Sequence, residues 1–130
     1  MNQADTSGVA GALVTIFIVD DEPMLLDLAM AILEPLGYDV RTFSNPDTAL
    51  AKLAAAKPAL IVTDFAMGKV SGLDLIRECK RRDPLQKIML LSGTVDETIY
   101  ADCTAKPDAF LAKPYQISDL IASVQKLAAR

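Results

Sequence analysis

The stretch that decides the fold reads Val14-Thr15-Ile16-Phe17-Ile18-Val19, followed at once by Asp20-Asp21-Glu22-Pro23. A short, nearly continuous apolar run predicts a strand that is buried on both faces of a parallel sheet. Apolar residues then recur at helical spacing up to Gly37, which is a stop signal, so a helix is expected next. The residues expected to face inward from this helix are Leu25, Leu28, Ala29, Ile32, Leu33 and Leu36.

The same unit of strand and helix recurs along the rest of the chain. Further strands are predicted at 38–43, 60–63, 88–91 and 109–112. Further helices are predicted from Pro46 to about Ala54, after Gly72 as far as Pro84, at 96–103, and from about Ser118. Strand 38–43 alternates polar and apolar residues and is expected near a sheet edge, whereas the other strands are expected to be buried on both faces. Five such units predict the α/β class: one doubly wound domain with a five-stranded parallel sheet and five helices.

Composition excludes several classes of function. The chain has 130 residues, 52% of them apolar, with 13 basic and 17 acidic side chains, two cysteines and no histidine. These values exclude a disordered chain, a Ser-His-Asp hydrolase, and a protein that carries phosphate on a histidine of its own. Two isolated cysteines argue against a structural zinc site. The net charge of −4 gives no field that would attract nucleic acid directly.

Neither a membrane span nor a secretory signal is expected. No apolar run approaches the 18 or so residues that a membrane-spanning helix needs, so no membrane partner is expected. Residues 1–13 lack the basic start of a signal peptide and are expected to form a flexible leader before a domain at 14–130. The expected compartment is therefore the cytoplasm.

Polar side chains stand where four of the predicted strands end. Asp20-Asp21 ends the first strand, Asp64 the third, Ser92 the fourth, and Lys113-Pro114 the fifth. Ligands of doubly wound sheets bind at the carboxyl ends of the strands, so these residues are expected to share one pocket. Oxygen ligands without histidine or cysteine favour a hard divalent cation, above all Mg²⁺. A metal ion and an ammonium beside a carboxylate nucleophile suit phosphoryl transfer to an aspartate.

These residues resemble the receiver domain of two-component response regulators, and in particular single-domain chemotaxis-type receivers. The resemblance covers about residues 14–129 and is carried by 19–22, 64–72, Ser92-Gly93 and Lys113-Pro114. It implies a flavodoxin-like sheet with strand order 2-1-3-4-5. It also implies a magnesium site in which Asp21 binds the ion directly and Asp20 binds it largely through water. Asp64 and the backbone carbonyl of Ala66 would complete the protein ligands.

The resemblance further implies a catalytic and switching role for four side chains. Asp64 would be the phosphoacceptor, and Lys113 would pair with Asp64 or its phosphate, with the bond to Pro114 in the cis form. Ser92 would be the hydroxyl that moves onto a phosphoryl oxygen, and Phe110 the aromatic side chain that rotates with it. Phe110 lies in a predicted strand, where packing in the core is the simpler interpretation.

The implied partners are those of a phosphorylation-controlled switch. A histidine kinase or a histidine phosphotransfer protein would supply the phosphoryl group, and the domain would catalyse only its own phosphorylation and dephosphorylation. The fourth helix (96–103), the fifth strand and the fifth helix would form the face that binds an output domain, an output protein or a second copy of the chain. Whether the domain acts alone or within a larger regulator stays open.

Two positions depart from the family pattern. Gly68 stands where proline is usual, and Gly93 stands where alanine or a larger residue is usual, which would open access to Asp64.

A phosphatase of the haloacid dehalogenase type would carry a second aspartate at position 66, where this chain has alanine. A flavodoxin-type cofactor carrier would need a phosphate-binding first loop, which is absent. An inert docking module would be expected to lose the acidic pair, the acceptor or the lysine.

Overall fold

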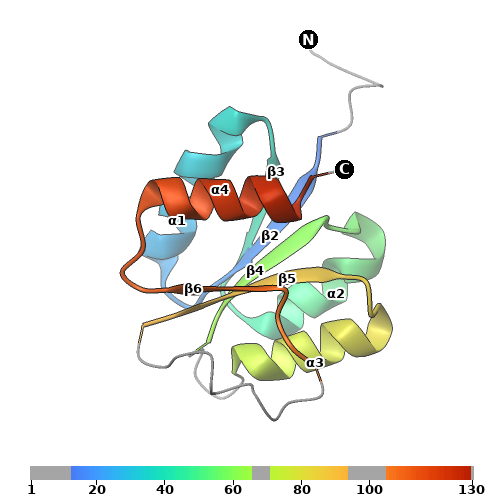
Figure 1. The fold of residues 1–130 in the computed structure, drawn as a ribbon. Helices are drawn as coiled ribbons and strands as arrows, with labels where there is room; N and C mark the ends of the chain where they lie inside the picture. Colours follow the sequence, from blue (N-terminus) through green and yellow to red (C-terminus); the bar gives the residue numbers. More distant parts are fainter. Residues whose placement is uncertain (1–12, 66–70, 94–104, 130) are drawn as a thin grey trace.

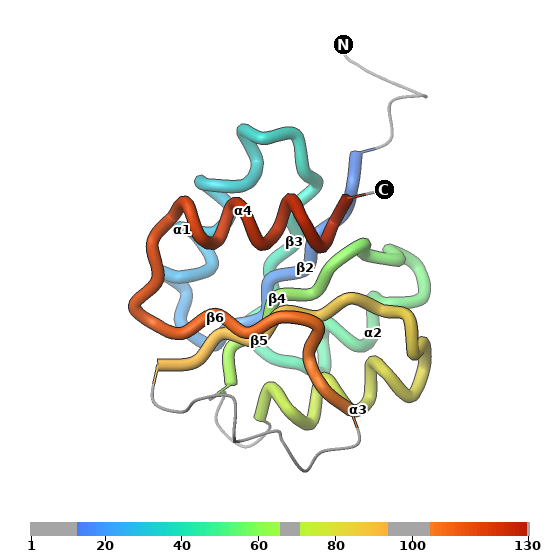
Figure 2. The backbone as a smooth tube through the Cα atoms, viewed as in Figure 1, coloured from blue at the N-terminus to red at the C-terminus, as the bar shows by residue number. Residues whose placement is uncertain are grey.

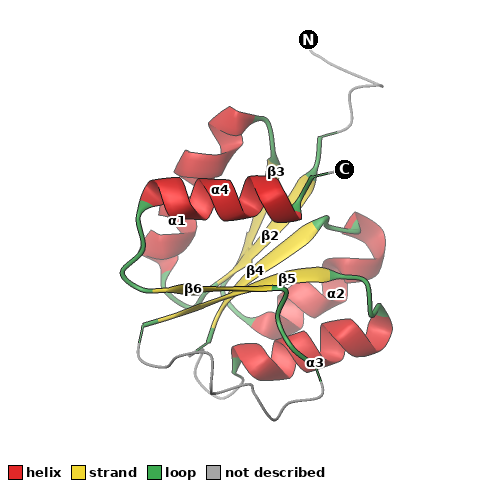
Figure 3. Ribbon diagram, viewed as in Figure 1, coloured by secondary structure: helices red, strands yellow, loops and turns green. Residues whose placement is uncertain are grey.

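The computed structural model describes residues 13–65, 71–93 and 105–129. The strands are β2 (Thr15–Val19), β3 (Asp39–Phe43), β4 (Leu60–Asp64), β5 (Lys87–Ser92) and β6 (Ala109–Ala112). The helices are α1 (Pro23–Leu33), a short 3₁₀ turn η1 (Glu34–Leu36), α2 (Pro46–Ala56), α3 (Gly72–Arg82) and α4 (Ile117–Leu127). Figures 1 and 3 show these elements in sequence colours and by type. The helix predicted at 96–103 lies outside the described residues.

All five strands form one parallel sheet in the order β3-β2-β4-β5-β6. Numbered along the chain, this is the predicted order 2-1-3-4-5, and β3 lies at an edge as expected. One core cluster joins the sheet to α1 and α4, and a second joins it to α2 and α3, so helices cover both faces. Figure 2 shows the chain leaving β4 and β5 at the same side of the sheet. The polar strand ends therefore meet at one edge.

The prediction for the inner face of the first helix was partly wrong. Leu26, Ala29 and Leu33 are the buried residues of α1, whereas Leu28 is 46% exposed and Leu36 is 45% exposed. Leu36 belongs to η1, which contains Pro35 and ends the α-helical period at Leu33. Both stripes of α1 are apolar, so spacing alone does not say which of them faces the sheet.

The prediction that the last strand is buried on both faces was also wrong. Ala109, Phe110 and Leu111 of β6 are only partly buried, and Ala112 is exposed. The reason is its place in the sheet, because β6 is an edge strand that pairs only with β5. A short apolar run identifies a strand but does not report how many neighbours the strand has.

A charged contact ties α3 to the start of β6. The Lys80 ammonium donates to Asp108 Oδ2 at 2.8 Å and to the Gln86 carbonyl oxygen at 2.7 Å. Asp108 Oδ2 also accepts from the backbone N–H of Ile88 at 2.9 Å, at the beginning of β5. One carboxylate thus joins a helix and two strands at the edge of the sheet where the strands begin.

Replacing Asp108 with alanine should lower the free energy of unfolding by about 1 kcal/mol, because the Lys80 ammonium and the Ile88 N–H would both lose an acceptor. Urea denaturation followed by circular dichroism measures the loss. Asp27→Ala is the control, because Asp27 is an exposed carboxylate of α1 outside its first turn that should change stability by less than about 0.5 kcal/mol. Equal stabilities of wild type and Asp108→Ala would contradict the assigned contact.

No helix in the described part of the chain is long and apolar enough to cross a membrane.

Candidate functional site

Three carboxylates gather at the ends of β2 and β4. Asp20 and Asp21 follow β2, and Asp64 is the last residue of β4. The register pairs Val19 with Thr63, which brings the two strand ends side by side. One oxygen from each carboxylate lies within 4.8 Å of those of the other two. Asp20 and Asp64 are buried, at 4% and 8% exposed, whereas Asp21 is exposed.

Backbone contacts hold the two buried aspartates in place. The N–H of Asp20 donates to the carbonyl oxygen of Phe43 at 3.0 Å, and Asp20 Oδ1 accepts from the N–H of Glu22 at 2.9 Å. Thr63 Oγ1 donates to the carbonyl oxygen of Asp64 at 3.1 Å. The carboxylates are thus positioned by the sheet and by the first turn of α1.

Lys113 supplies the positive charge of the site. Its Nζ lies 2.7 Å from Asp64 Oδ1 and 3.9 Å from Asp20 Oδ2, while its backbone N–H donates to the Ser92 carbonyl oxygen at 2.7 Å. Burial lowers the pKa of Lys113, but the hydrogen bond to Asp64 and the charges of Asp64 and Asp20 outweigh it and leave the pKa above its usual value. The lysine therefore stays charged. The Lys113–Pro114 bond is cis, as expected.

Ser92 and Phe110 lie beside this group on β5 and β6. Ser92 ends β5, is 2% exposed, and pairs in register with Ala112, the residue before Lys113. Phe110 is partly buried and packs against the core cluster that contains α3. The structure thus brings together Asp20, Asp21, Asp64, Ser92 and Lys113. Ala66 and Gly68 lie outside the described residues.

The charges of the site suit a hard cation. Burial, more than any other cause, raises the pKa of Asp20, and the charge of Asp64 raises it further. Among the residues that the structure describes, three carboxylates face one ammonium, so acidic groups outnumber basic ones in this part of the site. All three acids offer oxygen ligands, which Mg²⁺ prefers. The residues present therefore fit a magnesium ion.

Comparison with known proteins assigns the family. The chain matches the family described as response regulator receiver domain over residues 16–125, and it belongs to that family. It is 30% identical over 113 residues to the response regulator receiver protein CpdR of Brucella abortus, covering 86% of this chain and 94% of CpdR. It is 29% identical over 122 residues to the probable transcriptional regulatory protein TcrX of Mycobacterium tuberculosis, covering 92% of this chain and 52% of TcrX. The chain thus spans about half the length of TcrX.

Solved structures agree with this assignment. A CheY-like response regulator receiver domain protein from Methanospirillum hungatei matches with a TM-score of 0.82 and 26% identity, covering 90% of this chain and 94% of that one. The response regulator TrrA of Thermotoga maritima, solved in complex with Mg²⁺ and BeF, matches with a TM-score of 0.76 and 28% identity, covering 88% and 99%. Membership of this family implies phosphorylation-dependent signalling in a two-component system. Receiver domains are generally signalling switches rather than metabolic enzymes.

Some residues that position the site were not singled out from the sequence. Thr63 is fully buried and holds the Asp64 carbonyl, and Gly72 donates its N–H to the Phe65 carbonyl oxygen at 2.8 Å. The sequence marked Gly72 only as the start of a helix, and its neighbours Ser71 and Asp74 have the spacing of a helix-capping pair and form one. These residues act on the backbone of β4 and its connection to α3, so side-chain chemistry alone does not reveal them.

Proposed function

We propose that this domain accepts a phosphoryl group on Asp64 from a phosphohistidine of a histidine kinase or a histidine phosphotransfer protein. The observation that carries the proposal is the contact of 2.7 Å between Lys113 Nζ and Asp64 Oδ1, beside two further carboxylates. This arrangement supplies a nucleophile, a fixed cation and a set of metal ligands at one strand edge. No histidine is present in these 130 residues, so the donor phosphohistidine would lie outside this sequence.

The proposed reaction is a transfer between two protein side chains. A carboxylate oxygen of Asp64 attacks the phosphorus, a P–O bond forms, and the P–N bond to the donor imidazole breaks. The electron pair of that bond stays on the imidazole nitrogen. Lys113 would bind a phosphoryl oxygen as negative charge develops on it, and Ser92 would donate a hydrogen bond to another.

We assign the ligands of a magnesium ion to Asp20, Asp21, Asp64 and the backbone carbonyl of Ala66. The support is the cluster of three carboxylates within 4.8 Å and the similarity to TrrA, which was solved in complex with Mg²⁺ and BeF. When bound, such an ion would neutralise negative charge on the phosphoryl oxygens while the phosphoryl group is transferred. Asp20 and Asp64 are held by backbone contacts, so they would present their oxygens with little rearrangement.

The proposed output is a change of packing around Ser92 and Phe110. Both residues lie on the two strands nearest Lys113, and Phe110 borders the core cluster of α3. Drawing the Ser92 hydroxyl toward phosphate would favour an inward ring of Phe110 and alter the surface of β6 and α4. Residues 96–103, which lie outside the described part of the chain, are expected from the sequence to belong to the same surface. That surface would bind an output domain, an output protein or a second copy of the chain in the cytoplasm.

Intact-mass measurement tests the proposal. The protein is incubated with Mg²⁺ and either acetyl phosphate or phosphoramidate, and a gain of one phosphoryl group is expected. Asp64→Asn should abolish the gain, whereas Asp47→Asn, an exposed aspartate of α2, should leave it intact. Chelation of Mg²⁺ by EDTA should also suppress it. Phosphorylation that persists in Asp64→Asn would refute the assignment of the acceptor.

Replacing Gly93 with alanine should slow hydrolysis of the phosphorylated protein about threefold, a barrier increase of about 0.7 kcal/mol. A Cβ at this position would lie 3.5 Å from Lys113 Cβ and 3.8 Å from Lys113 Cδ, which are ordinary contacts, so the fold should tolerate it. The added methyl group would narrow the approach of water to the lysine and the phosphate. Loss of phosphoryl mass over time measures the effect. Hydrolysis at the wild-type rate would show that Gly93 does not control access.

A further inference from the structure

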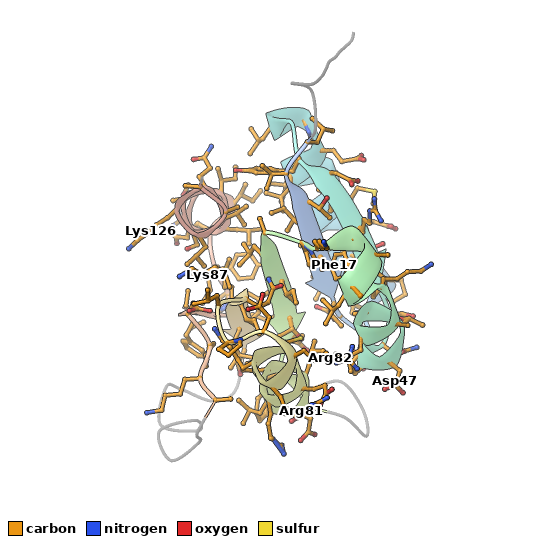
Figure 4. All side chains as sticks on the ribbon, turned by 90° about the vertical axis from the view of Figure 1, so that its right-hand side faces the viewer. Phe17, Asp47, Arg81, Arg82, Lys87 and Lys126 are labelled. Atoms are coloured by element: carbon orange, nitrogen blue, oxygen red, sulfur yellow. The ribbon has the colours of Figure 1, made fainter. Side chains whose placement is uncertain are left out.

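A cleft separates the carboxyl-terminal ends of α2 and α3. Its volume is about 510 Å³, within the range of small-molecule sites. The two helices pack side by side, and the guanidinium of Arg82 donates to the Leu50 carbonyl oxygen at 3.0 Å across their boundary, where Figure 4 labels Arg82. The cleft borders Pro58, just before β4, whereas Asp64 ends β4 at the opposite edge of the sheet. The length of β4, roughly 13 Å at about 3.3 Å per residue, therefore separates the cleft from the phosphoacceptor.

Half of the residues that line the cleft are apolar: Leu53, Ala54, Pro58 and Cys79. Pro58 and Cys79 are buried, Leu53 is partly buried, and Ala54 is exposed. Burial, as the main cause, raises the pKa of the Cys79 thiol to about 11, so the thiol is neutral at physiological pH. An uncharged lining of this kind favours a hydrocarbon or an aromatic ring over a polar group.

The polar residues that line the cleft are Lys57, Arg82, Asp83 and Gln86. Lys57 caps α2 in the left-handed conformation, with φ of 47°. Arg82 is fixed by Glu78 at 2.8 Å and by the Leu50 carbonyl. Asp83 Oδ1 accepts from the N–H of Leu85 at 3.0 Å. Neither Lys57 nor Asp83 forms an ion pair with a residue that the structure describes, so two cations and one carboxylate leave the lining with a net positive charge.

We propose that this cleft binds a small amphipathic carboxylate, with its apolar body against Leu53, Ala54, Pro58 and Cys79 and its carboxylate at Lys57 and Arg82. This site is separate from the phosphorylation chemistry and does not depend on it. Most of the binding free energy would come from the apolar body, because an exposed ion pair contributes little. The contribution of Lys57 is therefore to select an acid over an amine of the same shape.

Titrations of the unphosphorylated protein with octanoate, octylammonium and octanol, followed by two-dimensional ¹⁵N–¹H NMR, test the proposal. Octanoate should give saturable shifts confined to residues 53–58 and 79–86 and should bind more tightly than octanol. Octylammonium should bind most weakly. If Lys57 serves only to complement the helix dipole, octylammonium will bind as well as octanoate, and that result overturns the proposal. Absence of saturable shifts, or shifts spread over the whole domain, overturns it as well.

Two pairs of variants complete the test. Ala54→Trp should fill the cleft and abolish octanoate binding, whereas Ala55→Trp, on a neighbouring exposed position of α2, should bind normally. Lys57→Gln should weaken octanoate binding roughly threefold without changing octanol binding, whereas Lys52→Gln should change neither. The second pair leaves the cleft open, so it stays informative if tryptophan at position 54 disturbs folding. Equal behaviour within either pair would overturn the proposal.

Discussion

Replacing Gly72 with alanine is expected to lower the free energy of unfolding by about 3 kcal/mol and to slow phosphorylation of Asp64 at least tenfold. Gly72 is the buried first residue of α3, and its N–H donates to the Phe65 carbonyl oxygen at 2.8 Å. A Cβ there would overlap the carbonyl oxygen of Asp64 and would lie 3.1 Å from Phe65 Cα and 3.0 Å from Leu90 Cδ1. Two of these three atoms belong to backbone, so a side-chain rotation cannot relieve the overlap. Either α3 or the end of β4 must move.

Urea denaturation and the rate of phosphoryl gain from acetyl phosphate together test this expectation. A shift of β4 would move the Asp64 carboxylate relative to Lys113 and so affect stability and rate together. Gly37→Ala provides the matched control. Gly37 has φ of 96° but nothing within 4 Å of an added Cβ, so alanine there should cost about 1 kcal/mol and leave the rate unchanged. A stable Gly72→Ala variant that is phosphorylated at the wild-type rate would show that α3 does not constrain the acceptor.

The position of the site could be predicted because each of its side chains stands directly after a strand signal. Asp20 follows an apolar run, as do Asp64 and Ser92, and the carboxyl ends of parallel strands necessarily share one edge. Strand order 2-1-3-4-5 came from the resemblance rather than from periodicity, since no local pattern specifies which strands are neighbours. The structure confirms this order. The roles of the site residues remain proposals that the phosphorylation experiment tests.

What could not be predicted depends on contacts between residues far apart in the sequence. Burial of Leu26 instead of Leu28 follows from how α1 lies on the sheet, and both residues are leucine. The bond from Lys80 to Asp108 spans 28 positions and joins a helix to a loop, a pairing that no spacing rule describes. Gly72 could be recognised as the start of a helix. That this position cannot accommodate a Cβ is apparent only from the fold, in which the backbone at the end of β4 lies against it.

The Asp20→Asn variant should be more stable than wild type in EDTA at pH 7 and should bind Mg²⁺ more weakly. Burial raises the pKa of Asp20 in the folded protein above its usual value of 3.8, so the folded state holds a proton that the unfolded chain releases. Stability is therefore lost as pH rises through the raised pKa, and the charged form of Asp20 is a burden at neutral pH. In wild type the Asp20 carboxylate is repelled by the Asp64 carboxylate, which has an oxygen within 4.8 Å, and the attraction of Lys113 Nζ at 3.9 Å only partly offsets this repulsion. A neutral asparagine at position 20 removes the repulsion. It still accepts the hydrogen bond from the Glu22 N–H.

Thermal unfolding in EDTA and in Mg²⁺, at several pH values, separates the two effects. The gain of Asp20→Asn should shrink as pH falls from the raised pKa toward 3.8, because Asp20 is then protonated in the folded state and increasingly so in the unfolded chain. Added Mg²⁺ should raise the Tm of wild type more than that of the variant, since a ligand stabilises only the state that binds it. Asp27→Asn, which removes an exposed carboxylate of α1 outside the cluster, should change neither quantity. A variant less stable than wild type in EDTA would mean that Asp20 acts chiefly through Lys113 and the first turn of α1. The charged form of Asp20 lowers the stability of the domain, and a negative charge at this position is what binding of a cation requires.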